Sequence, residues 1–136
     1  MRIVALGLIR DRDRIFLSRG WDSVTQRTFY RALGGGVDWQ ETSLDALKRE
    51  FREEIAAELT NINYLGCIEN IFTLEDQPKH EIIQLYSCDF LDPHFYQLQE
   101  LTFTEKTRTK IALWVDINSC LSRELTVVPE EFLNYL

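Results

Sequence analysis

Cysteine is scarce in this sequence, and long apolar runs are missing from it. The three cysteines, at positions 67, 88 and 120, are odd in number, widely spaced and not arranged as Cys-x-x-Cys. That pattern argues against a disulfide framework or a zinc site and predicts reduced thiols in the core. No apolar stretch approaches the ~20 residues of a membrane-spanning helix, and the N-terminus lacks the parts of a signal peptide. We therefore expect a cytoplasmic protein with no membrane partner.

Positive charge is scarce too. The chain has 15 Lys and Arg against 22 Asp and Glu, which gives a net charge of −7 at pH 7. This balance repels a long polyanion and supplies no basic track, so it argues against long nucleic acid as a partner. A small phosphorylated metabolite accompanied by divalent cations remains compatible, because the cations neutralise both the ligand and its site.

Repeats, linkers and low-complexity tracts are also absent. With 136 residues the chain has the size of one domain, so we expect a single domain over residues 1–136 without a regulatory appendage. Sequence patterns predict strands at 3–9, 14–18, 63–74, 80–90 and 111–117. Helices are predicted after Glu41 and, with proline in the first turn, at 129–136. Strands interleaved with helices favour a layered α/β domain.

The segment from residue 34 to residue 54 is the most informative. Apolar positions 44, 47, 51 and 55 recur at helical spacing, and Thr42 with Asp45 can cap the helix start. At about 100° per residue, Glu50, Glu53 and Glu54 fall within an arc of roughly 100° beside the apolar stripe. Three like charges within one turn repel one another, so a positive partner is expected there.

A divalent cation suits these carboxylates, because Mg²⁺ is usually held by a few carboxylates, water and substrate phosphates. The alternative is a solvated acidic helix face, which is typical of an isolated Glu-Glu pair. The preceding glycines, residues 34–36, allow positive φ and close backbone approach, so that carbonyls and amides can face a metal or a phosphate. On their own they would indicate an ordinary hairpin turn.

The spacing joins these features into one motif. Gly35, five residues, Glu41, seven residues, Arg49-Glu50, two residues and Glu53-Glu54 together resemble the signature box of the Nudix, or MutT-like, hydrolases. The likeness extends over most of residues 2–117, but only the box is specific. It implies a Nudix fold, a mixed β-sheet sandwiched between α-helices, with the site at the sheet end that contains the glycines.

Two positions depart from that motif. Leu33 stands where a proline is common, and Ala56-Ala57 replace a glycine and an aliphatic residue. Since the helix-ending glycine is missing, we predict that the helix continues to about Glu58 or Leu59. Neither change removes a carboxylate.

The resemblance also implies residue roles. Glu50, Glu53 and Glu54 would be the metal ligands, completed by a backbone carbonyl of Gly34 or Gly35, with Mg²⁺ as the cofactor and Mn²⁺ as a substitute. Glu53 and Glu54 belong to the catalytic group, and Glu53 is a candidate base.

Supporting and auxiliary roles follow from the same resemblance. Glu41 and Arg49 would orient the cluster, and Arg49 can pair with Glu53 four residues later. A further catalytic acid is expected from a polar loop before the last strand, where Glu105 is preferred over Glu100. A merely solvated glutamate is the alternative.

Substrate contacts are harder to assign. Arg19 and Arg31 flank the expected pocket and could bind phosphate oxygens, and Trp21 is the best candidate to stack on a base. Phe29 and Phe72 are predicted to pack in the core. His80 is interpreted as a structural residue at the start of a strand, since no second histidine completes a metal motif.

The leading functional hypothesis is a Mg²⁺-dependent pyrophosphohydrolase that cleaves a nucleoside diphosphate linked to another group, such as ADP-ribose or a nucleotide sugar. One alternative is a (d)NTP pyrophosphohydrolase that cleans the nucleotide pool. Another is a non-catalytic Nudix module that senses a nucleotide. Because dimers are common in the resembling family, a homodimer is also possible.

Overall fold

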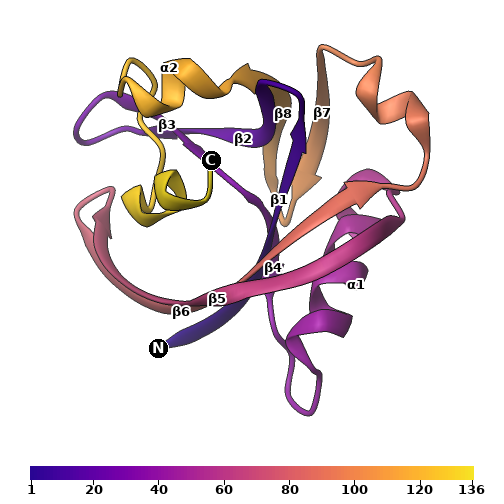
Figure 1. Ribbon diagram of the computed structural model, residues 1–136. Coiled ribbons are helices and arrows are strands. Elements are labelled where there is room, and N and C mark those ends of the chain that lie inside the picture. The colour runs from indigo at the N-terminus through magenta and orange to yellow at the C-terminus, as the bar shows by residue number, and fades with distance from the viewer.

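The computed structural model describes residues 1–136 as a mixed sheet with helical segments on both faces (Figure 1). In chain order the elements are β1 (Arg2–Asp11), β2 (Arg14–Asp22), β3 (Arg27–Arg31), β4 (Leu33–Gly36), α1 (Ser43–Ile55), β5 (Leu59–Leu74), β6 (Gln77–Phe90), the 3-10 helix η1 (Pro93–Tyr96), β7 (Glu100–Glu105), β8 (Arg108–Asp116), α2 (Ile117–Leu121) and the 3-10 helix η2 (Glu130–Tyr135).

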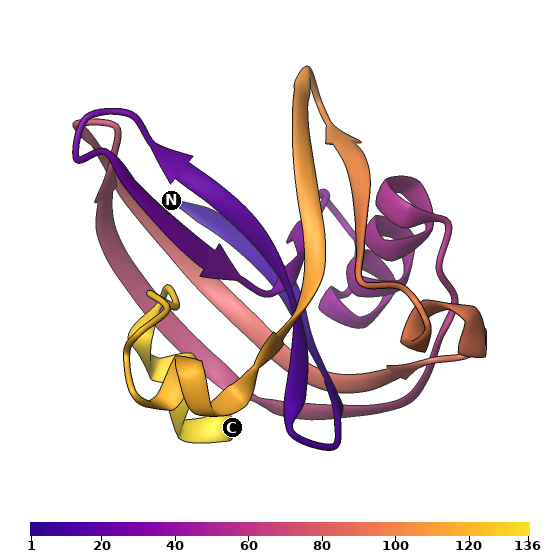
Figure 2. The ribbon, with the colours of Figure 1, turned by 90° about the horizontal axis from the view of Figure 1, so that it is seen from above.

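The strand order of the sheet is β5-β6-β1-β2-β8-β7, with β3 paired to β2 and β4 paired to β1. β1 and β6 are parallel, and the other pairs are antiparallel. Three long hairpins, β2–β3, β5–β6 and β7–β8, extend from this framework, and Figure 2 shows all three from above. The mixed sheet between helical layers confirms the predicted fold class.

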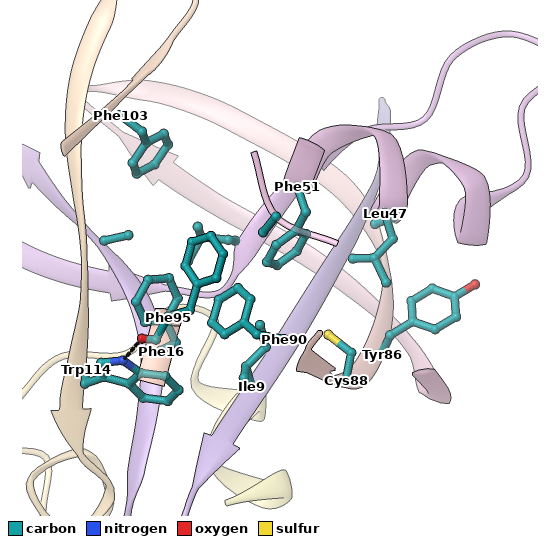
Figure 3. Close-up of a cluster of buried hydrophobic side chains, with 14 of the residues drawn as sticks. Ile9, Phe16, Leu47, Phe51, Tyr86, Cys88, Phe90, Phe95, Phe103 and Trp114 are labelled. Carbon is teal, nitrogen blue, oxygen red and sulfur yellow. Dashed lines mark hydrogen bonds between the residues drawn. The ribbon is translucent and has the colours of Figure 1, made fainter. Parts of the chain in front are cut away.

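Two hydrophobic cores lie on opposite faces of the sheet. The first packs Leu47 and Phe51 of α1 against an aromatic cluster that includes Phe90, Phe95 and Trp114 (Figure 3). The rings of Phe90 and Phe95 stack with centroids 4.5 Å apart, and Trp114 Nε1 donates to the Phe95 carbonyl at 2.9 Å. This core fixes α1 on the sheet.

The second core attaches the C-terminal segments to the other face. It joins Cys120 of α2 and Phe132 of η2 to Val4, Leu6 and Ile83 of the central strands. Each of the two cores therefore packs one helical layer against the sheet. Secondary structure and packing agree in placing α1, together with η1, on the face that contains the carboxylates.

Helix α1 begins as predicted and ends earlier than predicted. Thr42 is its N-cap and accepts a hydrogen bond from the Asp45 amide. The helix stops at Ile55 because Ala56 adopts the left-handed conformation, with φ 55°. The Ala56 amide donates to the Arg52 carbonyl at 3.0 Å, which is an αL closure without glycine, and the Ala57 amide donates to the Phe51 carbonyl at 3.1 Å. Burial of Ala57 in the first core helps to offset the strain at Ala56, so the expected extension to Glu58 was wrong.

The glycines form a strand and not the ordinary hairpin turn that they would indicate on their own. β4 pairs antiparallel with β1, and Gly34 has a φ of 141° there. A Cβ at Gly34 would lie 2.0 Å from the Ala5 carbonyl oxygen, so only glycine permits this close approach. The glycine segment is thereby fixed in the sheet beside α1.

The five predicted strands are confirmed, but β3, β4, η1, β7 and α2 were missed. Glu105 ends β7 instead of lying in a loop, since the polar segment 100–105 pairs with β8. Cys67 is exposed on the edge strand β5, which corrects the prediction of a core thiol, whereas Cys88 and Cys120 are buried. The structure contains no helix long and apolar enough to cross a membrane.

Candidate active site

The carboxylate cluster forms where α1 packs against β4. Gly35 faces Glu50 so closely that a Cβ there would lie 2.4 Å from the Glu50 carboxyl carbon. The Glu50 carboxylate therefore occupies the space that the missing side chain leaves. Glu54 lies one turn further along α1 and interacts with Glu50.

Glu54 is the most perturbed acid of the site. Its Oε1 is buried and has no hydrogen-bond partner. Burial is the main reason that the pKa of Glu54 rises to about 9; the contact with Glu50 and repulsion from Glu105 act in the same direction, and Lys110 opposes them. An isolated buried carboxylate is unfavourable, so Glu54 holds a proton at neutral pH unless a cation compensates its charge.

The hairpin β7–β8 brings a further acidic residue and a basic residue to this cluster. Glu105 and Lys110 lie close enough to shift the pKa of Glu54 through their charges, and Lys110 Nζ is 3.4 Å from Glu105 Oε1. The other candidate, Glu100, stands exposed at the opposite end of β7. Of the two acids named from the sequence, only Glu105 approaches Glu54.

Arg49 connects the supporting residues of the motif. Its guanidinium donates to both oxygens of Glu41, at 2.8 and 2.9 Å, and to the Gly36 carbonyl at 2.9 Å. Further contacts reach Glu50 at 2.9 Å and Glu53 at 3.2 Å. The Arg49 hydrogen bonds hold the pKa of Glu41 down at about 2. This side chain ties the end of β4, the loop after it and α1 together.

The donor set fits a hard divalent cation. The unpartnered Glu54 oxygen, the Glu50 carboxylate and the adjacent glycine backbone are all oxygen ligands of the kind that Mg²⁺ takes. No three acidic, His or Cys side chains are arranged as a complete metal cluster. The Glu53 side chain explains part of this, because it is 60% exposed and turned toward Arg49.

A cavity of about 910 Å³ opens from the cluster. Its lining includes Glu54, Glu105 and Lys110 at the carboxylate site and residues of all three hairpins. The hairpin tips touch: the Glu75 amide donates to Asp22 at 3.3 Å, and Arg108 lies 3.6 Å from the Glu75 carboxylate. The cavity is thus bounded by segments far apart in the sequence.

Two of the three residues expected to bind substrate do not line this cavity. Arg19 and Trp21 alternate along β2 with Ser18 and Asp22, which do line it. Strand alternation therefore turns Arg19 and Trp21 to the other face, and Trp21 is 55% exposed there. Their predicted contacts with the ligand have no support in this geometry.

Arg31 does line the cavity, but it forms an ion pair with the buried Glu81. It is therefore not a free phosphate clamp. Phe29 and Phe72, predicted to pack in the core, line the cavity instead.

Sequence reasoning missed two cationic side chains near the carboxylate cluster. Lys110 lies beside Glu105, and the Arg2 guanidinium covers Gly36, where a Cβ would meet Arg2 Nη2 at 3.2 Å. Both line the cavity, and Arg2 has no ion-pair partner. No local pattern marks Arg2, since its position depends on the pairing of β1 with β4.

The fold is similar to those of several solved structures. A NUDIX hydrolase from Nitrosomonas europaea aligns with a TM-score of 0.64 and 16% identity, over 94% of this chain and 81% of that one. The MutT protein from Bacillus halodurans gives 0.63 and 16%, over 96% and 77%. The solution structure of the E. coli ORF135 protein gives 0.59 and 20%, over 96% and 83%. At these identities the likeness establishes the fold.

Sequence comparison is more specific. The NAD-capped RNA hydrolase NudC of Pseudomonas putida is 42% identical over 59 residues, which are 43% of this chain and 21% of that protein. The match therefore spans about a fifth of this relative. The model of the NUDIX domain matches residues 1–134. Since that match covers nearly the whole chain, the protein belongs to the Nudix family.

Proposed function

We propose that this protein is a Mg²⁺-dependent hydrolase that cleaves the diphosphate linkage of a nucleoside diphosphate derivative, such as ADP-ribose or a nucleotide sugar. Family membership supports a hydrolase that acts on pyrophosphate bonds. The observation on which the proposal depends is the buried, unpartnered Glu54 oxygen at the end of a large cavity. Such an atom is unfavourable unless a cation uses it.

Each residue of the cluster has a role in this proposal. Glu50, Glu53 and Glu54, with the Gly35 carbonyl, would hold Mg²⁺, and Mn²⁺ can substitute. The cation would supply Lewis acidity and charge neutralisation at the diphosphate. Glu53 can reach the site only by leaving its contact with Arg49. The hydrogen bonds of Arg49 to Glu41 and Gly36 hold β4 and α1 together.

The proton acceptor is best assigned to Glu105. Glu105 lines the cavity beside Glu54, whereas Glu53 is directed outward. A base must lie within reach of the proton that it removes. Lys110, next to Glu105, and Arg2, over Gly36, are placed to face the negative charge of the phosphates. These residues replace Arg19 and Arg31 as the proposed phosphate contacts.

The charge pattern supports a small ligand. The protein is acidic overall, with a net charge of −7, whereas the cavity lining is balanced, with seven Lys and Arg against seven Asp and Glu. The lining therefore repels a small anion less than the rest of the surface does. The partial likeness to a NAD-capped RNA hydrolase also makes dinucleotide diphosphates worth testing.

A substrate panel tests the proposal. Phosphate-bond cleavage would be followed for ADP-ribose, nucleotide sugars, dinucleoside polyphosphates, and natural and oxidised nucleoside triphosphates, each with Mg²⁺, with Mn²⁺ and with a chelator. We expect metal-dependent cleavage of the diphosphate-linked compounds. Preferential cleavage of triphosphates would instead assign the protein to nucleotide-pool cleaning. Binding of a nucleotide without any cleavage would indicate a sensor module.

A further inference from the structure

Arg31, Asn70 and Glu81 form a buried polar group in the cavity, separate from the carboxylate cluster. Glu81 is 5% exposed and Asn70 is 8% exposed. Asn70 Nδ2 donates to Glu81 Oε1 at 3.1 Å, and Arg31 forms an ion pair with the same oxygen. All three line the cavity that also contains Glu54. Burying such groups is costly unless they are paired or used.

The group still offers hydrogen-bonding atoms to a ligand. Only an amide nitrogen can donate to a carboxylate, so the contact with Glu81 fixes the amide of Asn70 and leaves its Oδ1 free. Glu81 Oε2 also has no hydrogen-bond partner. Glu54 Oε1 is the only side-chain atom that is both fully buried and without a partner, so Asn70 Oδ1 and Glu81 Oε2 are both accessible from the cavity. Arg31 retains further N–H donors. The cavity wall therefore presents two acceptors beside a donor.

Two aromatic side chains lie beside the group, both on its side toward the hairpin tips. Phe29 precedes Arg31 by two residues on β3, and Phe72 follows Asn70 by two residues on β5. Strand alternation places each ring on the same face as its polar neighbour, and both rings line the cavity. Aromatic rings next to hydrogen-bonding atoms are the means by which proteins hold a nucleobase.

The sheet sets the distance between this group and the carboxylate cluster. Gly35 pairs with Ala5 on one edge of β1, and Glu81 pairs with Arg2 on its other edge. Three residues along the strand and two strand spacings across separate the two positions by about 14 Å. That separation suits a ligand with its phosphates at one end and its base at the other.

We propose that Arg31, Asn70 and Glu81, with Phe29 and Phe72 beside them, form a base subsite that selects a base with an exocyclic amine. In adenine and cytosine the amine lies beside a ring acceptor that complements the guanidinium; in guanine it lies beside a ring N–H that can donate to the second free oxygen. Uracil and hypoxanthine have a carbonyl oxygen in place of the amine, which would face the Glu81 carboxylate. The inference deepens the proposed function, because it rests on phosphates binding at the other end of the cavity.

The test uses pairs of nucleotides that differ only at this edge: CMP against UMP, and AMP against IMP. Their dissociation constants for the metal-free protein would be measured by NMR titration. We expect the amine-bearing member to bind about 10- to 100-fold more tightly in each pair, because the wrong base leaves buried polar atoms unpaired. Equal affinities within both pairs would overturn the subsite.

The variant Glu81→Gln keeps one acceptor for Arg31 and Asn70 but replaces the free oxygen by an amide group. We expect it to lose the preference within both pairs. Glu69→Gln is the matched control, since Glu69 is exposed on the neighbouring strand β5 and does not line the cavity. A preference that survives in Glu81→Gln would refute the role of Glu81. If that variant does not fold, the wild-type pairs still decide the question.

Hydrolysis of the corresponding nucleoside diphosphate derivatives separates this inference from the proposed function. Cleavage of cytidine and uridine compounds at equal rates would overturn the base subsite and leave the hydrolase intact. Selective binding without metal-dependent cleavage would refute the hydrolase and leave the subsite intact.

Discussion

Replacing Glu54 by Gln should abolish activity and at the same time stabilise the metal-free protein. Gln has nearly the same shape as Glu but does not ionise. The variant therefore avoids the cost, present in the wild type, of keeping a proton on a buried carboxyl that is ionised in the unfolded chain. In the folded protein its pKa is raised from 4.5 to about 9 by burial and by the neighbouring acids. The folded state therefore binds more protons than the unfolded state between these values, and the free energy of unfolding falls as pH rises through that window.

The size of the effect follows from the same values. At about pH 7.5, roughly three pH units above the unfolded-state pKa of 4.5, keeping the proton on Glu54 costs the folded state at most ~4 kcal/mol. Relaxation and the proton shared with Glu50 reduce this bound, so we expect a gain of about 1–3 kcal/mol, or roughly 4–10 °C in Tm. The gain should vanish below about pH 4.5, where Glu54 is protonated in both the folded and the unfolded wild type. Turnover should fall by several orders of magnitude, because a ligand of the cation is lost.

Urea unfolding with a chelator, at about pH 5 and about pH 8, measures the first effect. Repeating it with excess Mg²⁺ should stabilise the wild type but not Glu54→Gln, since binding to the folded state alone raises stability. Removing any negative charge from a chain with net charge −7 also relieves repulsion, so Glu69→Gln at an exposed position is the control. The reasoning is refuted if Glu54→Gln gains no more than that control at high pH, or if Mg²⁺ stabilises it as much as the wild type.

Three further changes test other parts of the site and fold. Arg49→Lys should lower kcat/KM at least 10-fold with the fold intact, because Lys cannot replace the forked guanidinium that joins Glu41 to Gly36. Circular dichroism would check the fold and steady-state kinetics the activity; unchanged kinetics would contradict this role. Glu105→Gln should lower kcat about 10²-fold or more with little change in KM, and a normal kcat would leave Glu105 without a chemical role. Ala56→Gly should raise the free energy of unfolding by up to about 1 kcal/mol, since φ 55° suits glycine; a loss in urea unfolding would show that Ala56 is not strained.

The sequence was sufficient to locate the carboxylate site, because its residues lie on one helix and the segment before it. Spacing along α1 places Glu50 and Glu54 on one side, and the Thr42 cap follows from local chemistry alone. The helix end was missed because it depends on tertiary structure. Burial of Ala57 in the first core favours a helix end at Ile55. The sequence does not indicate this end, because it requires Ala56, and not a glycine, to adopt the left-handed conformation.

The substrate contacts were predicted poorly because they depend on which face of a strand a residue occupies. In β2 a shift by one residue exchanges Arg19 and Trp21 with Ser18 and Asp22. The polar residues beyond Leu17 contain no alternating apolar signal to fix that choice. The base subsite joins residues from β3, β5 and β6, so no local window contains it.

The register of β1 sets how the carboxylate cluster and the proposed base subsite are placed relative to one another. One edge of β1 pairs with β4 and holds Gly35 against Glu50, while the other pairs with β6 and sets Glu81 beside Arg2. A slip of one residue on either edge would turn the paired side chains to the opposite face. β1 cannot slip easily, since its residues from Val4 to Leu6 are buried in the two cores. Hydrophobic packing of one central strand thus fixes the distance between the carboxylate cluster and Glu81, on which the proposed base subsite depends.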